Sequence, residues 1–364
     1  MSNCCVLDRF ASDLPPVSAT VCLGEGATPV IELPALAHRL GVRSVWAKVE
    51  TANPTGSYKD RVAAMSLSLA LSRGYRGWIA TSSGNAGMAM AAYGARAGLP
   101  GFICLAGSVP PEKSLPLMAY GSNAVTVVRV KGAGRPEVDV HMFEQVRDAA
   151  QRHHLYLGVT LHAFNPDGMR GIDTIAYELA EQVPAATHVY VPVGGGGLLA
   201  AVARGLVQRG LRPRMVACQA SGCAPVVQYL DGAAPAVAVE RSTTSISAVQ
   251  LPRPPDGDLA AEAVARSQGW GTAIDDEAIL AAQRWLASVE GVFVEPAAAA
   301  TVAALLADAD HGRLAPDARP VVMLTGGGWK DLGRFAADAS RVRMIDVEAV
   351  ARQVDGWVST TTLD

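Results

Sequence analysis

The sequence has no stretch that would direct it to a membrane or to a nucleic acid. None of its apolar runs reaches about 18 residues, the length that a membrane-spanning helix requires. The N-terminus lacks the basic segment followed by an apolar segment that marks a secretory signal. The net charge is only −3, and Lys and Arg are spread along the 364 residues without a basic block. We therefore expect a cytoplasmic protein with no membrane partner and no nucleic-acid partner.

The sequence also lacks a recognisable metal-binding pattern. Its six cysteines include no C-x2-C pair, and the adjacent Cys4 and Cys5 cannot form one. There are seven histidines, but the neighbouring His153 and His154 cannot share one face of a helix. We expect no metal ion in this protein.

What the sequence does contain is a regular alternation of short apolar strands and Ala/Leu-rich helices. Half of the residues are hydrophobic, which is ample for a large core, and the length favours two domains. The expected strands cover residues 45–49, 78–81, 101–105, 125–130, 188–193, 215–219 and 321–324. The expected helices include residues 62–71, 86–97, 141–152, 173–181 and 198–209. Short buried strands separated by helices predict an α/β protein with mostly parallel sheets covered on both faces.

Residues 53–61, which read Asn-Pro-Thr-Gly-Ser-Tyr-Lys-Asp-Arg, form a loop between an expected strand and an expected helix. Pro54 and Gly56 cannot continue a strand, and Ser57 suits the N-cap of the helix. Lys59 then stands at the positive end of the helix dipole, where a cation is disfavoured. An ammonium in such a place loses its proton readily, and the free amine can form a Schiff base with a carbonyl compound. From these residues alone, a solvated lysine is the simpler interpretation.

Four consecutive glycines connect an expected strand to an expected helix: Gly194, Gly195, Gly196 and Gly197. Such a turn presents free backbone N–H groups and the positive end of a helix to an anion, with no Cβ in the way. The dinucleotide fingerprint G-x-G-x-x-G is not formed, because its sixth position is Leu199. A tight strand–helix turn is the alternative. Four glycines cost much chain entropy, so we favour a phosphate site.

Two more loops follow expected strands and suit a ligand. Residues 82–87, which read Ser-Ser-Gly-Asn-Ala-Gly, open a second helix whose N-terminus can hold a carboxylate or a phosphate. The last expected strand is followed by Thr325 and three glycines, and a threonine hydroxyl there can hydrogen-bond a ring nitrogen. Each loop alone is also compatible with an ordinary turn.

Taken together and in this order, the loops resemble those of pyridoxal phosphate (PLP) enzymes of the tryptophan synthase β type, known as fold type II. The closest pattern is that of the threonine synthases, which carry a similar Leu-Gly-Glu-Gly-x-Thr-Pro segment, here residues 23–29. The resemblance covers residues 24–331. It implies two α/β domains with PLP in the cleft between them, the smaller formed by residues 52–164 and the larger by residues 1–51 plus 165–364. It also implies a homodimer.

The resemblance assigns roles to residues of the four loops. Lys59 would hold PLP as a Schiff base and, once the substrate amine displaces it, take the Cα proton as a general base. The PLP phosphate would lie on the backbone of Gly194 to Leu198, the ring hydroxyl oxygen on Asn85 and the ring nitrogen on Thr325. The substrate carboxylate would be bound by Ser82, Ser83 and Gly84.

Three residues depart from the threonine synthase pattern and leave the substrate open. The family usually carries an Asn in the glycine loop and an Arg in N-P-x-R-x-x-G. This chain has only Gly in that loop, and Gly168 stands at the Arg position with Arg170 two places on. Tyr58 replaces the usual Phe. Because Arg is the natural bidentate partner of a phosphate, binding of a phosphorylated substrate would need Arg170 or another cation, such as Lys113 or Arg241.

The expected function is therefore that of a PLP-dependent lyase of the threonine synthase type. It would act by elimination or replacement on an amino acid such as O-phospho-L-homoserine, giving threonine and phosphate. A threonine or serine dehydratase, or a related enzyme for another hydroxy or phospho amino acid, is the alternative. A non-catalytic protein that binds PLP or an amino acid is an alternative of another class, although a pure binder would not need Lys59. Because only about 33 residues follow Asp331 in this sequence, we expect no added regulatory domain in this segment.

Overall fold

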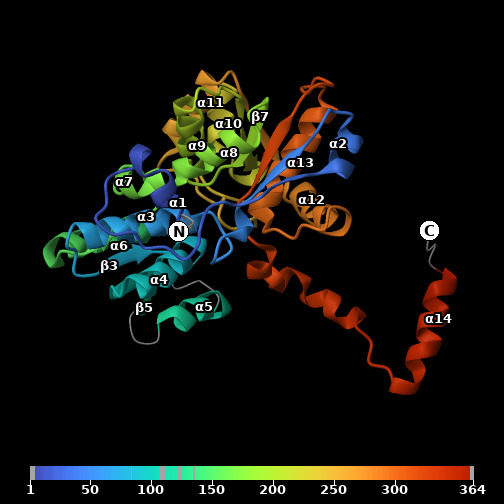
Figure 1. The fold of residues 1–364 in the computed structure, drawn as a ribbon, viewed down its shortest axis with the longest axis horizontal. Helices are drawn as coiled ribbons and strands as arrows, with labels where there is room; N and C mark the ends of the chain where they lie inside the picture. The colour runs from blue at the N-terminus through green and yellow to red at the C-terminus, as the bar shows by residue number, and fades with distance from the viewer. Residues whose placement is uncertain (1–4, 83, 107–110, 122–124, 134–135, 361–364) are drawn as a thin grey trace. The chain divides into compact units, whose positions relative to one another are not determined.

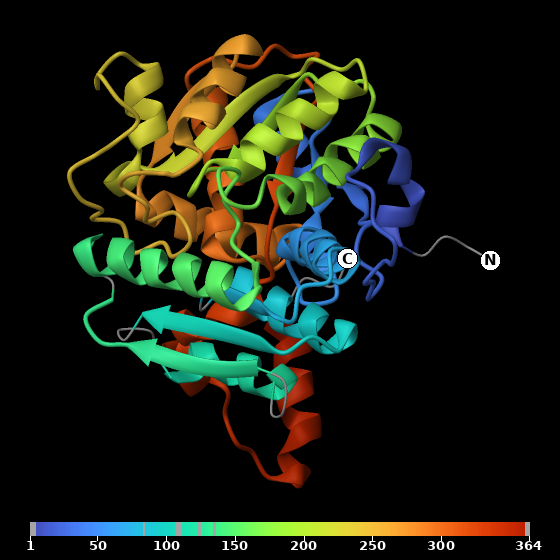
Figure 2. The same ribbon diagram turned by 90° about the vertical axis from the view of Figure 1, so that its left-hand side faces the viewer.

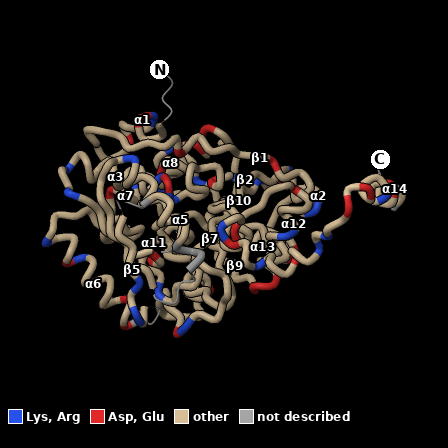
Figure 3. Tube along the Cα trace, turned by 90° about the horizontal axis from the view of Figure 1, so that it is seen from below, with Lys and Arg blue, Asp and Glu red and all other residues tan. Residues whose placement is uncertain are grey.

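The computed structural model describes residues 5–82, 84–106, 111–121, 125–133 and 136–360. The chain divides into two units, Met1–Gly328 and Trp329–Asp364 (Figure 1). Within the described residues no helix combines the length and the hydropathy that a bilayer crossing requires. Figure 3 shows Lys and Arg interspersed with Asp and Glu along the trace.

The first unit alternates helices with strands, as the sequence predicts. Its α-helices are α1 Val6–Arg9, α2 Pro34–Leu40, α3 Lys59–Ser72, α4 Asn85–Ala97, α5 Pro111–Gly121, α6 Pro136–His153, α7 Pro166–Met169, α8 Asp173–Gln182, α9 Gly197–Gln208, α10 Pro225–Leu230, α11 Gly257–Arg266, α12 Asp276–Val289 and α13 Pro296–Asp310. Short 3-10 helices are η1 Ala11–Asp13, η2 Glu50–Ala52, η3 Arg170–Ile172 and η4 Ser221–Cys223. The helices expected from the sequence are all present, with ends shifted by a few residues.

A six-stranded sheet forms the larger layer. Its strands are β1 Val30–Glu32, β2 Trp46–Val49, β7 His188–Pro192, β8 Arg214–Ala220, β9 Trp270–Ile274 and β10 Pro320–Leu324. Their order in the sheet is β1-β2-β10-β7-β8-β9, and all neighbours are parallel except β1 and β2. Strands of this sheet read as continuous apolar runs because both faces are covered.

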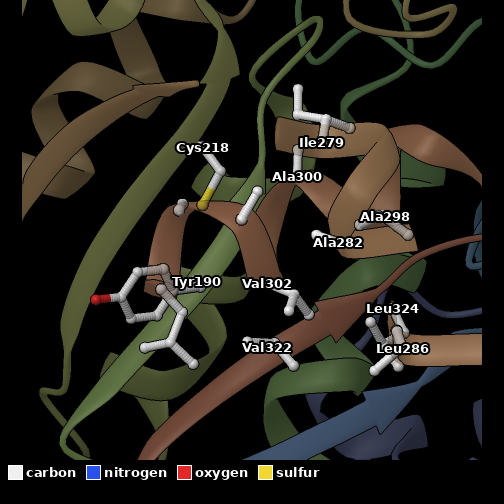
Figure 4. Close-up of a cluster of buried hydrophobic side chains, with 14 of the residues drawn as sticks. Tyr190, Cys218, Ile279, Ala282, Leu286, Ala298, Ala300, Val302, Val322 and Leu324 are labelled. Carbon is white, nitrogen blue, oxygen red and sulfur yellow. The ribbon is translucent and has the colours of Figure 1, made fainter. Parts of the chain in front are cut away.

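Helices cover both faces of the larger sheet. Successive residues of a strand point to opposite faces, so Tyr190 belongs to a core cluster with residues of α2, α12 and α13, whereas Val189 belongs to one with residues of α8, α9 and α11. Figure 1 shows these two groups of helices on either side of β7. Figure 4 shows the first face, where Tyr190, Cys218 and Val322 of the strands meet the small side chains of α13. The alanines of α13 let this helix approach the sheet closely.

A four-stranded parallel sheet forms the smaller layer. Its strands are β3 Trp78–Thr81, β4 Gly101–Ala106, β5 Val125–Val130 and β6 Tyr156–Leu157, in the order β5-β4-β3-β6. Helices α3, α4 and α5 pack on one face around Trp78 and Ile103. Helix α6 packs on the other face around Ile79 and Cys104, where Figure 2 shows it lying along the strands. Apolar residues of the N-terminal arm, including Phe10, join the cluster around Trp78.

The second unit is mostly helical. Its helices are η5 Gly328–Arg341, η6 Val347–Ala349 and α14 Val350–Thr360. Helix η5 begins at Gly328, the last residue of the first unit, and is kinked at Asp331. Many of its apolar side chains are exposed, among them Val342, Met344 and Trp357. The sequence predicts one helix over residues 346–354, and α14 extends beyond the end of that range.

Candidate functional site

Three loops that carry candidate residues leave the same edge of the larger sheet. Strands β2, β10 and β7 are neighbours and run parallel. The carboxyl end of β2 leads through η2 to the lysine loop, residues 53–58, and β10 leads to residues 325–328. The carboxyl end of β7 leads to the glycine loop, residues 194–197. Because the carboxyl ends of parallel strands share one edge, the sheet gathers these loops where α/β sheets bind ligands.

Backbone hydrogen bonds join the lysine loop to the loop after β10. The Tyr58 N–H donates to the Thr325 carbonyl at 3.1 Å, and the Gly327 N–H donates to the Gly56 carbonyl at 3.0 Å. Lys59 is the first residue of α3 and is partly buried, and its Nζ lies 4.7 Å from the centre of the Tyr58 ring. The amine of Lys59 is therefore carried by a backbone segment with little freedom to move.

Ser57 does not cap α3, which corrects the expectation from the sequence. The N-cap residue is Tyr58, and the buried Ser57 Oγ is among the described side-chain atoms without a hydrogen-bond partner. Instead, Asp60 closes the loop, because its carboxylate accepts the Thr55 N–H at 2.7 Å and also the Thr55 hydroxyl. A buried hydroxyl without a hydrogen-bond partner lowers the stability of the fold, and a ligand that hydrogen-bonds Ser57 would recover that loss.

A buried ion-pair cluster, formed by Lys48, Glu50, Arg61 and Glu178, fixes the start of α3. The Arg61 guanidinium donates to both oxygens of Glu50 and to both oxygens of Glu178, each at 2.8 Å. Lys48 Nζ lies 2.5 Å from Glu178, and all four side chains are at most 1% exposed. Burial would raise the pKa of the Glu178 carboxyl, but the attraction of Arg61 and Lys48 holds that pKa at about 2. Arg61 follows Lys59 by two residues in the first turn of α3, so the cluster helps to position Lys59.

Glu295, which the sequence analysis missed, joins Asn85 to Thr325. Asn85 Nδ2 donates to Glu295 Oε2 at 2.9 Å, and Thr325 Oγ1 donates to Glu295 Oε1 at 3.3 Å. The Glu295 N–H donates to the Gly326 carbonyl at 2.9 Å. Asn85 follows strand β3 of the smaller sheet, whereas Thr325 follows strand β10 of the larger sheet and Glu295 is the N-cap residue of α13. Two predicted site residues from different sheets therefore meet at one carboxylate.

The serine-rich loop before Asn85 closes on itself. The Gly84 N–H donates to Ser82 Oγ at 3.3 Å, and the Met88 N–H donates to the Gly84 carbonyl at 3.1 Å. A Cβ at Gly87 would collide with the Ser82 carbonyl oxygen, so this close turn needs a glycine. Ser83, another predicted substrate contact, lies outside the described residues.

The glycine loop is packed against residues 248–257. A Cβ at Gly194 would collide with the Ala248 carbonyl, and one at Gly196 with the Asp256 carbonyl. Gly196 also has φ of +92°, which a side chain disfavours. Gly195 differs, because the nearest atom to its added Cβ would be 3.8 Å away. Packing thus explains part of the glycine run, whereas a Cβ at Gly195, just before the 12-residue helix α9, would make only ordinary van der Waals contacts with Leu251 and Pro255.

A polar network reaches the glycine loop from the side. The Asp256 carboxylate accepts the His162 N–H at 3.1 Å and lies 3.1 Å from His162 Nδ1, and the Asp256 N–H donates to the Gly195 carbonyl at 2.9 Å. Arg204 Nη1 lies 3.1 Å from His162 Nε2. Because a guanidinium only donates, Nε2 accepts and Nδ1 carries the proton toward Asp256. This network holds Asp256 and His162 against the backbone of the glycine loop.

Arg170 belongs to the far end of the same network. Its Nε lies 2.5 Å from Asp173 Oδ2, and the same carboxylate binds Arg204. Arg170 Nη2 also donates to the Asp13 carbonyl at 2.9 Å. Arg170 is thus held between α8 and the N-terminal arm.

Gly168, at the position where the family carries Arg, is tightly enclosed. A Cβ there would collide with Asn165 Oδ1 and Ser66 Oγ. Asn165 is itself buried and bonds Ser66, the Val159 carbonyl and the Tyr156 hydroxyl. A larger residue at 168, arginine included, would require the buried Asn165 and Ser66 side chains to move.

The residues gathered here fit PLP. The fit rests on a partly buried lysine at a helix start, the unpartnered Ser57 hydroxyl in its loop and the glycine loop at the N-terminus of α9. The amine can form a Schiff base with the PLP carbonyl, the hydroxyl can donate a hydrogen bond, and the helix N-terminus can bind the phosphate.

Comparisons with known proteins agree with this site. Residues 21–326 match the family model described as "Pyridoxal-phosphate dependent enzyme". Threonine synthase of Methanosarcina acetivorans is 32% identical over 340 residues, covering 91% of this chain and 81% of that protein. Threonine synthase of Mycobacterium leprae is 36% identical, covering 91% and 89%. The fold of maize serine racemase superposes with a TM-score of 0.76 at 22% identity over 92% of this chain and 95% of that one.

The family match covers the lysine loop, the glycine loop and Thr325, and the threonine synthase relatives align over nearly the whole chain. PLP is accordingly the cofactor, and the protein is a PLP-dependent lyase of fold type II. The chain belongs to the pyridoxal-phosphate-dependent enzymes and, among them, to the threonine synthase family.

Proposed function

We propose that this enzyme converts O-phospho-L-homoserine and water to L-threonine and phosphate, with Lys59 as its catalytic residue. The relatives named threonine synthase support the reaction. The observation that carries the proposal is the convergence of the lysine, glycine and Thr325 loops at the carboxyl ends of β2, β7 and β10.

PLP, when bound, withdraws electrons from the substrate and makes its Cα–H acidic. The amine of Lys59 anchors the cofactor and, after the substrate amine has displaced it, removes and returns protons at the substrate carbons. Lys59 lies in the first turn of α3, which the hydrogen bonds of Arg61 hold in place. The amine can therefore stay close to the substrate carbons during the whole reaction.

The cofactor contacts follow from the loops. The backbone N–H groups of Gly194 to Leu198 hold the phosphate, supported by the positive end of α9. Asn85 would contact the ring hydroxyl oxygen and Thr325 the ring nitrogen, and for the latter the one Thr325 hydroxyl proton would have to leave Glu295. In the structure, Glu295 accepts a hydrogen bond from each of these two side chains.

The loop before α4 receives the substrate carboxylate through Ser82, Ser83 and Gly84. The N-terminus of this 13-residue helix favours an anion. Arg170 is the proposed cationic contact for the substrate phosphate. Since Arg170 now pairs with Asp173, that contact requires it to exchange partners.

The packing around Gly168 favours a second candidate, a threonine or serine dehydratase that releases a 2-oxo acid and ammonia. A substrate with a hydroxyl leaving group needs no arginine at residue 168, where Asn165 and Ser66 would have to move to admit one. The absence of Asn in the glycine loop points the same way.

The experiment supplies the PLP-loaded enzyme with O-phospho-L-homoserine, L-threonine and L-serine separately, and measures phosphate, threonine and 2-oxo acid. Release of phosphate and threonine in equal amounts supports the first candidate. A 2-oxo acid from threonine or serine without turnover of O-phospho-L-homoserine supports the dehydratase. Absence of turnover with all three substrates contradicts both.

We further propose that the two sheets belong to two domains, residues 52–164 and residues 1–51 plus 165–364, with the cofactor between them. The strands support this division, because all four strands of the smaller sheet lie within residues 52–164 and all six strands of the larger sheet lie outside that range. We also propose a cytoplasmic homodimer, on the resemblance to the family.

A further inference from the structure

A cluster of two thiols and one carboxylate lies apart from the loops described above. Cys5 precedes α1, and Cys22 and Glu25 lie in the segment that leads to β1. The two sulfur atoms and a carboxylate oxygen lie within 4.8 Å of one another, with Cys5 Sγ 3.8 Å from Glu25 Oε1. We name these three residues the thiol–carboxylate cluster.

The Glu25 carboxylate is almost fully buried, with 1% of the residue exposed. Its Oε2 accepts the Leu23 N–H at 3.0 Å and the Tyr93 hydroxyl at 2.9 Å. Its Oε1 faces the Cys5 thiol, a weak donor. Across the described part of the chain, no lysine, arginine or histidine forms an ion pair with Glu25. A buried carboxylate with one oxygen so poorly satisfied is costly, and a cation beside Oε1 would relieve that cost.

The chemistry of the cluster selects the kind of cation. Two sulfur ligands exclude magnesium and calcium, which prefer oxygen alone. Thiolate and carboxylate together suit zinc, for which sulfur atoms about 2.3 Å from the metal lie about 3.8 Å apart in a tetrahedron. Cys22 is only partly buried, so a water molecule can reach the fourth position and the side chain can adjust. Closing the cluster by about 1 Å or less would give zinc geometry.

We propose that Cys5, Cys22 and Glu25 bind one thiophilic divalent metal ion of the zinc class, with water as the fourth ligand. Binding replaces the protons of the two thiols with the metal, and both protons pass to solvent. No redox step is involved. The sequence pattern does not predict this site, because Cys5 and Cys22 lie far apart in the chain and form no C-x2-C pair.

The proposed metal would fasten the N-terminal arm to the segment beside the lysine loop. The Gly26 N–H, next to Glu25, donates to Asn53 Oδ1 at 3.0 Å, and the Ala27 N–H donates to Glu178 Oε1 at 2.8 Å. The metal would thus hold α1 to backbone that contacts the buried ion-pair cluster. Its role would be structural, and the readouts below do not depend on turnover.

The test uses the full PLP-loaded chain, purified, exposed to equimolar zinc and then dialysed against metal-free buffer. Zinc per chain is measured by elemental mass spectrometry, and thermal unfolding is followed with and without a chelator. Cys22→Ser and Glu25→Gln probe the cluster, and Cys104→Ala serves as the control, since Cys104 lies on the smaller sheet. A far-ultraviolet circular dichroism spectrum of each variant verifies folding.

One zinc per wild-type chain, kept by Cys104→Ala and lost by Cys22→Ser and by Glu25→Gln, would support the site. Zinc should then also raise the unfolding temperature of the wild type by a few degrees, and the chelator should reverse the rise. The proposal is overturned if folded wild-type protein retains no zinc, or if Cys22→Ser retains as much as the wild type. A Cys5–Cys22 disulfide in the freshly purified protein, detected by peptide mass mapping, would also overturn it.

Discussion

Replacement of Arg61 by methionine should destabilise the fold strongly, because Arg61 is the centre of the buried ion-pair cluster. Its guanidinium makes hydrogen bonds to Glu50, Glu178, Thr28 and Thr174. Removing it leaves two buried carboxylates against one ammonium, Lys48, which lies beside Glu178. Glu50 would keep only the Thr28 hydroxyl and the Asn53 amide as partners.

The magnitude follows from the uncompensated charge rather than from the count of lost hydrogen bonds. Breaking a fully buried ion pair on one side costs about 3–5 kcal/mol. That is a large share of the roughly 5–15 kcal/mol by which a typical domain is stable. Methionine fills part of the volume, so the loss of packing is the smaller effect. Combining Arg61→Met with Glu50→Gln removes one charge of each sign and should recover part of the loss.

The assay is urea unfolding of the PLP-loaded enzyme, followed by circular dichroism. Arg73→Ala is the control, because Arg73 pairs with Asp167 on the surface, where the two side chains are 46% and 41% exposed. Such a surface pair contributes at most about 1 kcal/mol. If Arg61→Met lost no more stability than Arg73→Ala, the buried ion-pair cluster would not be what stabilises the start of α3.

Three further predictions concern acid stability, the glycine loop and Glu295. Burial raises the pKa of the Glu178 carboxyl but Arg61 lowers it to about 2, below its ordinary 4.5. Its stabilisation should therefore be complete above pH 4.5 and lost as the pH falls toward 2, with a shallower loss in Glu178→Gln during urea unfolding at each pH. Gly196→Ala should weaken PLP binding about 5- to 30-fold in a fluorescence titration, because a positive φ costs alanine about 1–2 kcal/mol. Unchanged affinity would contradict the need for glycine there. Glu295→Ala should lower kcat/KM about tenfold or more, since Asn85 loses its acceptor, and normal kinetics would refute that role.

Much of the fold can be predicted from the sequence because strands buried on both faces read as apolar runs. Strands β3 and β5 have the expected bounds, and β2, β4, β7, β8 and β10 differ by a residue or so at their ends. Strand β9, which was not predicted, carries Gly271, a residue that weakens the pattern of a strand. A Cβ at Gly271 would lie 2.9 Å from the Val227 side chain, so packing of α10 explains the glycine. Strands β1 and β6 are too short to form a pattern.

The candidate site could be predicted only where local chemistry marks it. Lys59, Asn85 and Thr325 stand at strand or helix ends with characteristic neighbours, and the structure places Asn85 and Thr325 on one carboxylate. Glu295 lies 210 residues from Asn85 in the chain, so sequence spacing carries no information on their contact. Asp256 was likewise missed, because its partner His162 is 94 residues away. Such pairs depend on tertiary packing alone.

The central claim is that the amine of Lys59 carries the cofactor. The most direct measurement is borohydride reduction of the PLP-loaded enzyme, which converts a Schiff base to a stable amine, followed by peptide mass mapping. We predict one reduced cofactor per chain, attached to the peptide that contains Lys59, and none in Lys59→Ala. Attachment to another lysine, or an unchanged yield in Lys59→Ala, would contradict the account.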